Sequence, residues 1–562
     1  MSKYCDQVKE IIEQILPNVQ KPARYIGNEL NSAHKDWDKT SFKVAIAYPD
    51  TYEIGMSNLG IQILYDILNQ EKDILAERVF APWPDMEEQL ITNNLQLFSL
   101  ESWKPLTEFD LIGFGLGHEL TYTNIINMLK LGNIPIWQKD RQDNHPLIMG
   151  GGPCVFNPEP IADFFDFFVI GEAEEVIVEI AERLRDSKLD IRNSKLDALA
   201  KIPGIYVPSL NNKVTKRYIK DLTPAPYPLT PIIPFIEAVH DRAVVEIMRG
   251  CKWGCKFCQA AWTTRPVREK KMDKIIQIAD ELIKNSGHEE LSLVSLSTSD
   301  YSQIQELANT LAKKYEGKRI NISLPSMRTN TFSINLAKDV ARVRPSGVTL
   351  APEAGTQRLR DVIGKNMSEE NIMDGIESAF SAGISSIKLY FMIGLPTETE
   401  EDLLGICALA QKIIAAGKKH TNRARVTVNL ATFIPKPHTP LQWARQISIE
   451  ETLEKQRFIK QNLRGKSLTV RWHDASASFL EGVFARGDRK LALVIEKAWQ
   501  LGCRLDAWSE HLKFDLWQKA FNETGINPDN YLRERSTDEE LPWDFIDTGV
   551  PKERLLRAAN PD

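Results

Sequence analysis

Cysteine is scarce in this chain, which has only seven among 562 residues, and Cys5, Cys154, Cys407 and Cys503 stand alone. An odd set of scattered cysteines argues against a disulfide framework and favours a reducing, cytoplasmic setting. No apolar run approaches the ~18 residues of a membrane span, and the first residues have no apolar core, so we expect neither a span nor a secretory signal. The net charge is −6, which gives no general basic footprint for nucleic acid.

The remaining cysteines are concentrated in one short segment, EIMRGCKWGCKFC, as Cys251, Cys255 and Cys258 at the spacing CxxxCxxC. A zinc site wants a fourth ligand, but no second CxxC pair exists and the nearest histidines in sequence are His240 and His288. Three thiolates on an iron–sulfur cluster leave one iron open, as a catalytic metal requires. Structural thiols or partial zinc ligation remain as alternatives.

The surroundings of these cysteines fit a wrapped cluster. The run AVVEIMRG before them is typical of a buried strand, and Gly250 and Gly254 permit a tight loop. Trp253 and Phe257 are placed to shield a cluster from water. CxxxCxxC after a strand resembles the signature of the radical S-adenosylmethionine enzymes. The resemblance implies a [4Fe–4S] cluster whose open iron binds S-adenosylmethionine, which is then split reductively to a radical that abstracts hydrogen.

The segments after the cysteines alternate between strand-like and helix-like patterns, which predicts parallel strands with right-handed crossovers. They match the incomplete (β/α)6 barrel of that superfamily, with the active site at the carboxyl ends of the strands. The predicted strands after the first are ELSLVSLSTSD, RINISLPSMRTN, GVTLAPEAG, SSIKLYFMIG and RVTVNLATFIP.

Polar residues at these strand ends are the candidate binding residues for S-adenosylmethionine that the resemblance implies. Ser297 and Asp300 stand where the family usually carries a Gly-Gly-Glu-like motif for the amino group, although the two glycines are missing. Ser326 and Arg328 end the third strand, and arginine suits a carboxylate.

Two further strand ends and one basic segment complete the barrel's candidates. Glu353 is placed to hold the ribose, and Gly394 in FMIGLPTET to let backbone approach the adenine. The basic run 263–274 is read either as a solvated helix start or as a surface for an anionic substrate or an electron donor.

The first third of the chain predicts a doubly wound α/β domain and resembles the flavodoxin-like cobalamin-binding domain. Many such domains carry Asp-x-His-x-x-Gly after the first strand; here Asp50 is present and Tyr52 replaces the histidine that ligates cobalt. Gly151 belongs to a surviving glycine element, and His118 is a second candidate neighbour of cobalt. The resemblance therefore implies either cobalamin without a histidine ligand or a vestigial domain that serves packing or substrate docking.

The domain organisation follows from these patterns and from a proline-rich stretch, TPAPYPLTPIIP, that reads as an extended connector. Amphipathic helices dominate after the barrel, where we expect core burial and a cap over the barrel mouth with Glu481 among the residues to examine for substrate contacts. The predicted segments are a helical start (1–35), the cobalamin-binding-like domain (36–200), a linker (201–240), the barrel (241–440) and a mainly helical cap (441–562).

Motifs along nearly the whole chain resemble an uncharacterised bacterial branch of radical S-adenosylmethionine proteins with an N-terminal cobalamin-binding-like domain. The resemblance implies an enzyme that modifies an unactivated C–H site, with cobalamin-dependent methyl transfer as one outcome and a flavodoxin- or ferredoxin-type electron donor. The alternatives are a methylthiotransferase-like enzyme acting on RNA or protein and a non-enzymatic cobalamin- or redox-sensing iron–sulfur protein. RNA, a ribosomal protein or an anionic metabolite are all compatible substrates.

Overall fold

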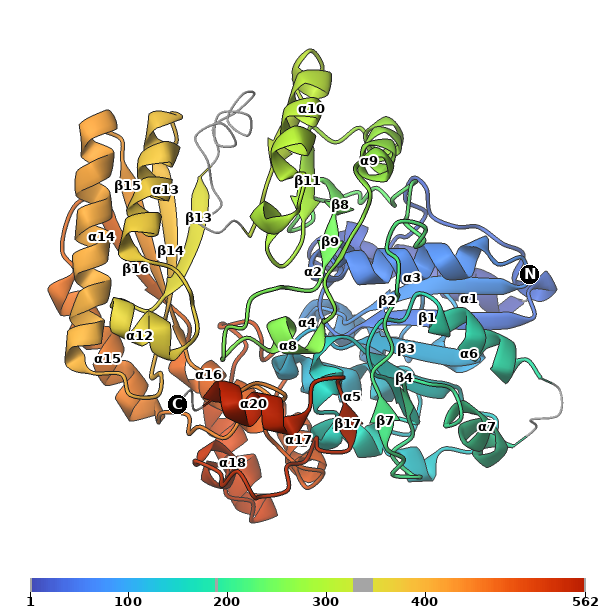
Figure 1. The fold of residues 1–562 in the computed structure, drawn as a ribbon. Helices are drawn as coiled ribbons and strands as arrows, with labels where there is room; N and C mark the ends of the chain where they lie inside the picture. The colour runs from blue at the N-terminus through green and yellow to red at the C-terminus, as the bar shows by residue number, and fades with distance from the viewer. Residues whose placement is uncertain (1–2, 187–190, 327–346, 560–562) are drawn as a thin grey trace.

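The computed structural model describes residues 3–186, 191–326 and 347–559. Two α/β bodies and a helical C-terminal region form the molecule (Figure 1). No helix in these three ranges is long and apolar enough to cross a membrane. The candidate residue Arg328 lies outside these ranges.

The N-terminal body is built on a six-stranded sheet in the order β2-β1-β3-β4-β5-β6. Its strands are parallel except for β6, which pairs antiparallel with β5. This order confirms the predicted flavodoxin-like doubly wound domain, in which ligands bind beyond the carboxyl ends of the strands. The strands are β1 (Phe42–Tyr48), β2 (Ile74–Phe80), β3 (Leu111–Gly115), β4 (Leu147–Gly151), β5 (Phe167–Val169) and β6 (Ile205–Tyr206).

Helices cover both faces of this sheet because its strands are almost completely buried and therefore need apolar partners on each side. Leu68 of α3 and Ile125 of α5 are both fully buried against it, in two separate hydrophobic cores. The helices of this body are α1 (Lys3–Ile15), α2 (Tyr52–Met56), α3 (Leu59–Gln70), α4 (Pro84–Thr92), α5 (Tyr122–Leu131), α6 (Val176–Leu184) and α7 (Arg192–Leu199).

The barrel is formed by two parallel sheets, one of three strands in the order β12-β11-β8 and one of four in the order β13-β14-β15-β16. Figure 1 shows them facing one another, with α12, α13 and α14 along the second sheet. All the predicted strands are present. The bounds are β8 (Ala243–Glu246), β11 (Glu290–Val294), β12 (Asn321–Ser323), β13 (Val348–Glu353), β14 (Ser386–Ile393), β15 (Arg425–Thr432) and β16 (Leu468–Trp472).

Strand β16 is an addition that the sequence did not predict, because it lies within the segment expected to be a helical cap. Its apolar residues Leu468, Val470 and Trp472 alternate with polar ones, but the run is only five residues long and largely exposed, and it is held by parallel pairing with β15. The connecting helices are α8 (Gln259–Thr263), α9 (Met272–Ser286), α10 (Ile304–Glu316), α12 (Gln357–Val362), α13 (Glu369–Ser381), α14 (Glu400–His420) and α15 (Ile449–Asn462).

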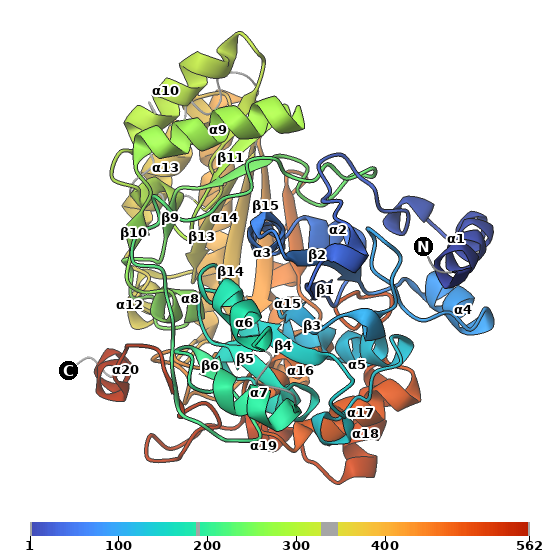
Figure 2. The same ribbon diagram turned by 90° about the vertical axis from the view of Figure 1, so that its right-hand side faces the viewer.

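Part of the C-terminal region packs on the N-terminal body, while its last residues pack beside the cysteine loop, and the cap over the barrel mouth stays a prediction. Trp137 donates a hydrogen bond to Glu496 at 3.0 Å, and Thr123 donates one to Asp506 at 2.6 Å. Figure 2 shows this region below the sheet of the N-terminal body. Its helices are α16 (Ala475–Ala485), α17 (Leu491–Leu501), α18 (Phe514–Thr524), α19 (Asp529–Leu532) and α20 (Lys552–Ala559).

The proline-rich connector between the two bodies has no helix, as its composition predicts. Two pairs of short strands also join separate parts of the chain. β9 (Met248–Arg249) pairs antiparallel with β10 (Arg268–Glu269) beside the cysteine loop, and β7 (Val214–Thr215) pairs with β17 (Ile546–Asp547) near the end of the chain.

Candidate active site at the cysteine loop

The cysteine loop leaves β9 at the carboxyl end of the first barrel strand. Gly250 makes the turn with φ +89°, and a Cβ there would lie 2.7 Å from the carbonyl oxygen of Pro266. Only glycine fits a position with both a left-handed backbone and such close packing. Cys255 is buried, while Cys251 and Cys258 are half-buried. The three thiols thus lie where barrel enzymes place their chemistry.

The number of cysteines in the loop bears on the group that it can hold. A structural zinc ion takes four protein ligands, whereas a [4Fe–4S] cluster held by three thiolates keeps one iron open. Among the described residues, the group of metal-ligand types that could share one ion is His118, Glu119 and Glu481, and it includes none of the three cysteines. The loop therefore fits a cluster better than a single ion.

Packing shields the loop from both sides. The indole of Trp262 donates to the carbonyl of Cys255 at 2.9 Å, and Phe257 packs on an apolar cluster that includes Leu359. Cys251 and Cys258 contact a second cluster built from Trp262, Trp443, Leu541, Trp543 and Leu555. Most of that second cluster comes from the end of the chain and was not predicted, because nothing in those segments signals proximity to a loop far earlier in sequence.

Asp300 and Ser297, predicted to bind the amino group of S-adenosylmethionine, lie directly against the cysteine loop. The Asp300 carboxylate accepts hydrogen bonds from Ser297 and from the indole of Trp253, and Lys252 Nζ lies 3.0 Å from its other oxygen. Its side chain is only 1% exposed. Ser326 joins the same group, because its carbonyl accepts from the amide of Thr298 at 3.1 Å.

Glu353 also faces the cysteines, in a left-handed conformation with φ +69° at the end of β13. Lys365 Nζ lies 3.1 Å from its carboxylate. Burial, the neighbouring thiols Cys255 and Cys251, and the Glu353 carboxylate together raise the pKa of Cys258 to about 11. A bound cation would reverse this shift, since positive charge nearby favours the thiolate form over the thiol.

Gly394 differs from its expected role. Its amide donates to the Glu398 carboxylate at 3.0 Å, and a Cβ on it would lie 2.6 Å from Ile447. The glycine is therefore needed for close packing against Ile447, and its N–H is already satisfied within the protein.

In the N-terminal body, Tyr52 is a core residue and points away from any ligand at the sheet edge. Only 1% of it is exposed, and its hydroxyl donates to Glu29 at 2.8 Å. Glu29 in turn pairs with Arg78 at 2.6 Å, and Arg78 pairs with Glu101 at 2.7 Å. Tyr52 accordingly has a structural partner that the local sequence around it does not reveal.

Asp50 and Gly151 lie at the carboxyl edge of the same sheet. Burial raises the pKa of Asp50, whose carboxylate accepts hydrogen bonds from the amide of Thr51 at 2.7 Å and from the indole of Trp508 at 2.9 Å. A Cβ built on Gly151 would meet no atom within 4 Å. Gly151 thus borders free space, whereas Asp50 is covered by the C-terminal region.

His118 is unsuited to ligate a metal through Nε2. Its Nδ1 accepts a hydrogen bond from the amide of Leu120 at 3.1 Å, so Nε2 carries the proton of the neutral ring and faces Glu481 at 3.5 Å. Lys436 Nζ lies 2.5 Å from Glu119 and 2.9 Å from Glu481. This ammonium group already occupies the position between the two carboxylates that a cation would take.

Three cations of the basic run 263–274 bind groups inside the protein, whereas Lys271 is exposed, so its reading as a surface for an anionic substrate or an electron donor stays a prediction. Arg268 is bound by Glu172, Lys270 Nζ donates to the carbonyl of Leu222 at 2.9 Å, and Arg265 donates to the carbonyl of Trp253 at 3.0 Å. These cations fix loops around the cysteines instead of facing solvent.

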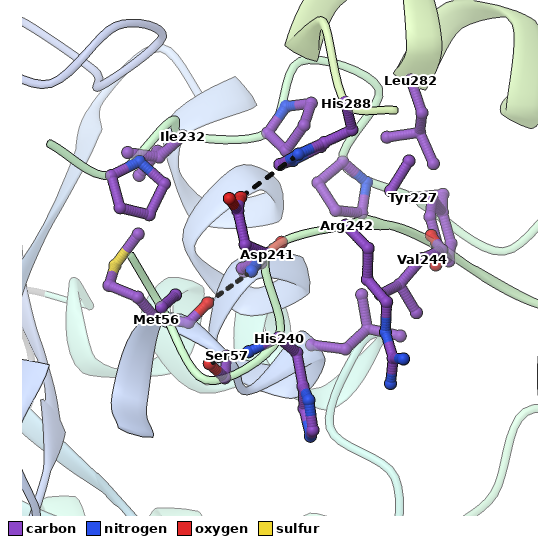
Figure 3. Close-up of a pocket in the computed structure, with 17 residues that line it drawn as sticks. Met56, Ser57, Tyr227, Ile232, His240, Asp241, Arg242, Val244, Leu282 and His288 are labelled. Carbon is purple, nitrogen blue, oxygen red and sulfur yellow. Dashed lines mark hydrogen bonds and ion pairs between the residues drawn. The ribbon is translucent and has the colours of Figure 1, made fainter. Parts of the chain in front are cut away.

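A separate pocket lies at the opposite, amino-terminal end of β8, where the linker meets the N-terminal body (Figure 3). His288 Nδ1 lies 3.3 Å from Asp241 across it. Its volume of about 40 Å³ is far below the ~300 Å³ of a small ligand pocket. The pocket therefore does not compete with the cysteine loop as the reaction site.

Comparison with known proteins places these features in a family. Residues 245–410 match the radical SAM superfamily, and residues 60–208 match the family described as radical SAM proteins, N-terminal. An uncharacterised protein of Methanocaldococcus jannaschii is 30% identical over 491 residues, covering 86% of this chain and 97% of that protein. An uncharacterised methyltransferase of Pyrococcus horikoshii is 25% identical over 285 residues, covering 49% of this chain and 60% of that protein.

A solved structure supports the fold. The cobalamin-dependent S-adenosylmethionine radical enzyme OxsB, described with aqua-cobalamin and S-adenosylmethionine bound, aligns with a TM-score of 0.52 at 13% identity. The alignment covers 99% of this chain and 84% of that one, so both α/β bodies share its arrangement. With the cysteine motif and the extent of the sequence matches, the chain belongs to the radical S-adenosylmethionine superfamily and is an enzyme of that class, with a [4Fe–4S] cluster and S-adenosylmethionine as its cofactors.

Proposed function

We propose that this enzyme cleaves S-adenosylmethionine reductively at the cysteine loop and uses the resulting radical to modify an unactivated C–H site. The observation that carries the proposal is the arrangement of the loop: three thiols on one turn at the carboxyl end of a barrel strand, with Asp300 tied against that turn through Trp253. A flavodoxin- or ferredoxin-type protein is proposed as the electron donor.

The residues around the loop have distinct proposed roles. Cys251, Cys255 and Cys258 hold the cluster, which supplies an open iron and one electron. Asp300, held in its buried position by Ser297, Trp253 and Lys252, is suited to the ammonium group of S-adenosylmethionine. Glu353, with a single ion-pair partner in Lys365, is suited to accept hydrogen bonds from ribose hydroxyls.

The test of this proposal is anaerobic reconstitution with iron and sulfide, followed by dithionite and S-adenosylmethionine. We expect a protein-bound [4Fe–4S] spectrum and release of 5′-deoxyadenosine or a methylated product. A purified anaerobic protein that holds zinc at this loop, or a reduced cluster that leaves S-adenosylmethionine intact, would refute it.

We further propose that the N-terminal body binds cobalamin, so that methyl transfer is the specific outcome. The free space at Gly151 lies at the carboxyl edge of a flavodoxin-like sheet, where ligands of this fold bind. The similar protein of P. horikoshii is described as a methyltransferase, and OxsB as cobalamin-dependent. Because Tyr52 is buried and His118 Nε2 carries a proton, neither is proposed as a cobalt ligand.

Two glycines of one strand give a matched test of cobalamin binding. Gly151→Val fills free space and should leave thermal stability nearly unchanged while weakening cobalamin binding at least tenfold. Gly150→Ala places a Cβ 2.6 Å from Phe168 in the core and should lower stability without selectively blocking the ligand. The measurement is the absorbance change on titration with hydroxocobalamin. Equal binding by wild type and Gly151→Val would remove this site from consideration.

A further inference from the structure

One loop of the N-terminal body reaches the strand pair that enters the cysteine loop. The segment 171–175 joins β5 to α6 at the carboxyl edge of the N-terminal sheet. Gly171 begins it with φ +113°, and a Cβ there would lie 2.0 Å from the carbonyl oxygen of Arg217. The backbone is thus locked in place, and its next residue, Glu172, extends toward the barrel.

Glu172 binds two arginines on paired strands. Arg268 of β10 donates from both guanidinium nitrogens to the two oxygens of Glu172, each at 2.8 Å. Arg249 of β9 lies 3.1 Å from the same carboxylate. The amide of Ile219 donates a further bond at 2.8 Å. Although burial raises it, the pKa of Glu172 lies below its usual value because Arg268 and Arg249 stabilise the carboxylate.

The two arginines need this carboxylate because of their position. Arg249 and Arg268 are directly opposite one another in the antiparallel β9–β10 pair. Like charges in such a pair repel. Glu174 and Glu246 each form an ion pair with the Arg249 guanidinium group, with nitrogen–oxygen distances of 2.7 Å. Among the described residues, Glu172 is the carboxylate that contacts both guanidinium groups.

The strand pair is continuous with the cluster ligands. Arg249 is followed directly by Gly250 and Cys251, and Gly250 packs against the backbone just before β10, where a Cβ on it would lie 2.7 Å from the carbonyl oxygen of Pro266. Separation of β9 from β10 would therefore displace the first ligand of the loop. Glu172 contacts Arg249, which lies two residues before Cys251, and charges close to a cluster help to set its reduction potential.

We propose that Glu172 is a positioning residue for the cluster, through which the N-terminal body fixes the geometry of the cysteine loop and tunes its reduction potential. The inference rests on the proposed cluster at Cys251, Cys255 and Cys258. It gives the N-terminal body a role at the reaction centre that does not depend on whether that body binds cobalamin.

The test uses charge changes of opposite sign. Glu172→Gln removes a negative charge and should shift the midpoint potential of the cluster to more positive values, since reduction adds an electron. Arg268→Gln removes a positive charge and should shift the potential to more negative values. Glu172→Asp keeps the charge and should return the potential toward that of wild type. The readouts are redox titration and electron paramagnetic resonance of the reduced cluster, with and without S-adenosylmethionine, at matched iron content.

A control on the same loop separates this effect from general damage. The Glu175 side chain is 57% exposed and lies 3.5 Å from Arg217, so Glu175→Gln should match wild type in both measurements. Shifts of the same sign in Glu172→Gln and Arg268→Gln, or a Glu172→Gln cluster indistinguishable from that of Glu175→Gln, would overturn the inference. If Glu172→Gln does not fold, the midpoint potential of the cluster in Arg268→Gln is compared with that in Glu175→Gln, and a more negative value in Arg268→Gln supports the inference while equal values overturn it. A wild-type protein without a [4Fe–4S] cluster refutes the proposed function itself and is recognised before any variant is made.

Discussion

The indole of Trp253 donates a hydrogen bond to the carboxylate of Asp300, which ties the loop between the first two cysteines to the end of barrel strand β11. Lys252, the neighbouring residue, reaches the other oxygen of the same carboxylate at 3.0 Å. The cysteine loop and the proposed amino-group site are consequently one connected unit, and we expect a substitution in either one to alter the geometry of the other.

Asp300→Asn should weaken the binding of S-adenosylmethionine by roughly tenfold, about 1.4 kcal/mol, because a neutral amide replaces the charged acceptor. The measurement is the change in the electron paramagnetic resonance spectrum of the reduced cluster as S-adenosylmethionine is added. Asp361→Asn, on the exposed side of α12, serves as the control. Unchanged affinity in Asp300→Asn would exclude Asp300 from the site.

Cys255→Ala should abolish the brown cluster chromophore after anaerobic reconstitution, because two thiolates do not hold a [4Fe–4S] cluster stably. Cys407→Ala removes a buried thiol of α14, which donates to the carbonyl of Ile459, and should keep the full chromophore. Iron and sulfide analysis quantifies both. A full cluster in Cys255→Ala would contradict the ligand assignment.

Tyr52→Phe should lower the free energy of unfolding by about 1 kcal/mol, because the hydrogen bond to Glu29 is lost from a buried charge network. It should leave the spectrum of any bound cobalamin unchanged. Urea denaturation measures the first effect, and Tyr390→Phe, on a residue 39% exposed, gives the reference. A shifted cobalamin spectrum in Tyr52→Phe would show that the hydroxyl faces the ligand.

His438 should make the protein sensitive to mild acid. The ring is buried, with Nε2 2.9 Å from the carbonyl oxygen of Phe156, and burial lowers its pKa to about 4. The unfolded histidine binds a proton near pH 6.5, so the unfolded state gains protons first and stability falls as the pH drops from 6.5 toward 4.

As the pH falls from 7 to 5, protonation of this histidine in the unfolded state should lower the free energy of unfolding by about 2 kcal/mol. Thermal or urea unfolding of wild type and His438→Gln across that range isolates the contribution, since other groups titrate in both proteins. Parallel stability curves for the two proteins would show that His438 does not titrate in this way.

Much of the architecture follows from local sequence. The sheet of the N-terminal body and the predicted barrel strands form where apolar β-rich runs alternate with helical periodicity, because burial on both faces of a parallel sheet requires that pattern. Strand β16 escaped prediction because its five residues are a short and mostly exposed run that pairing with β15 stabilises. The partners of the C-terminal helices could not be predicted, because an apolar stripe states that a surface is buried but not against what.

The sequence by itself determined that three thiols share one loop, since their spacing is a property of the chain. Only the tertiary structure decided what surrounds them. Residues near the end of the chain shield the loop, Glu172 of the N-terminal body contacts Arg249 just before it, and Tyr52 turns into the core to meet Glu29. Short-range order is encoded in neighbouring residues, whereas these contacts join segments far apart in sequence and depend on how complete elements pack.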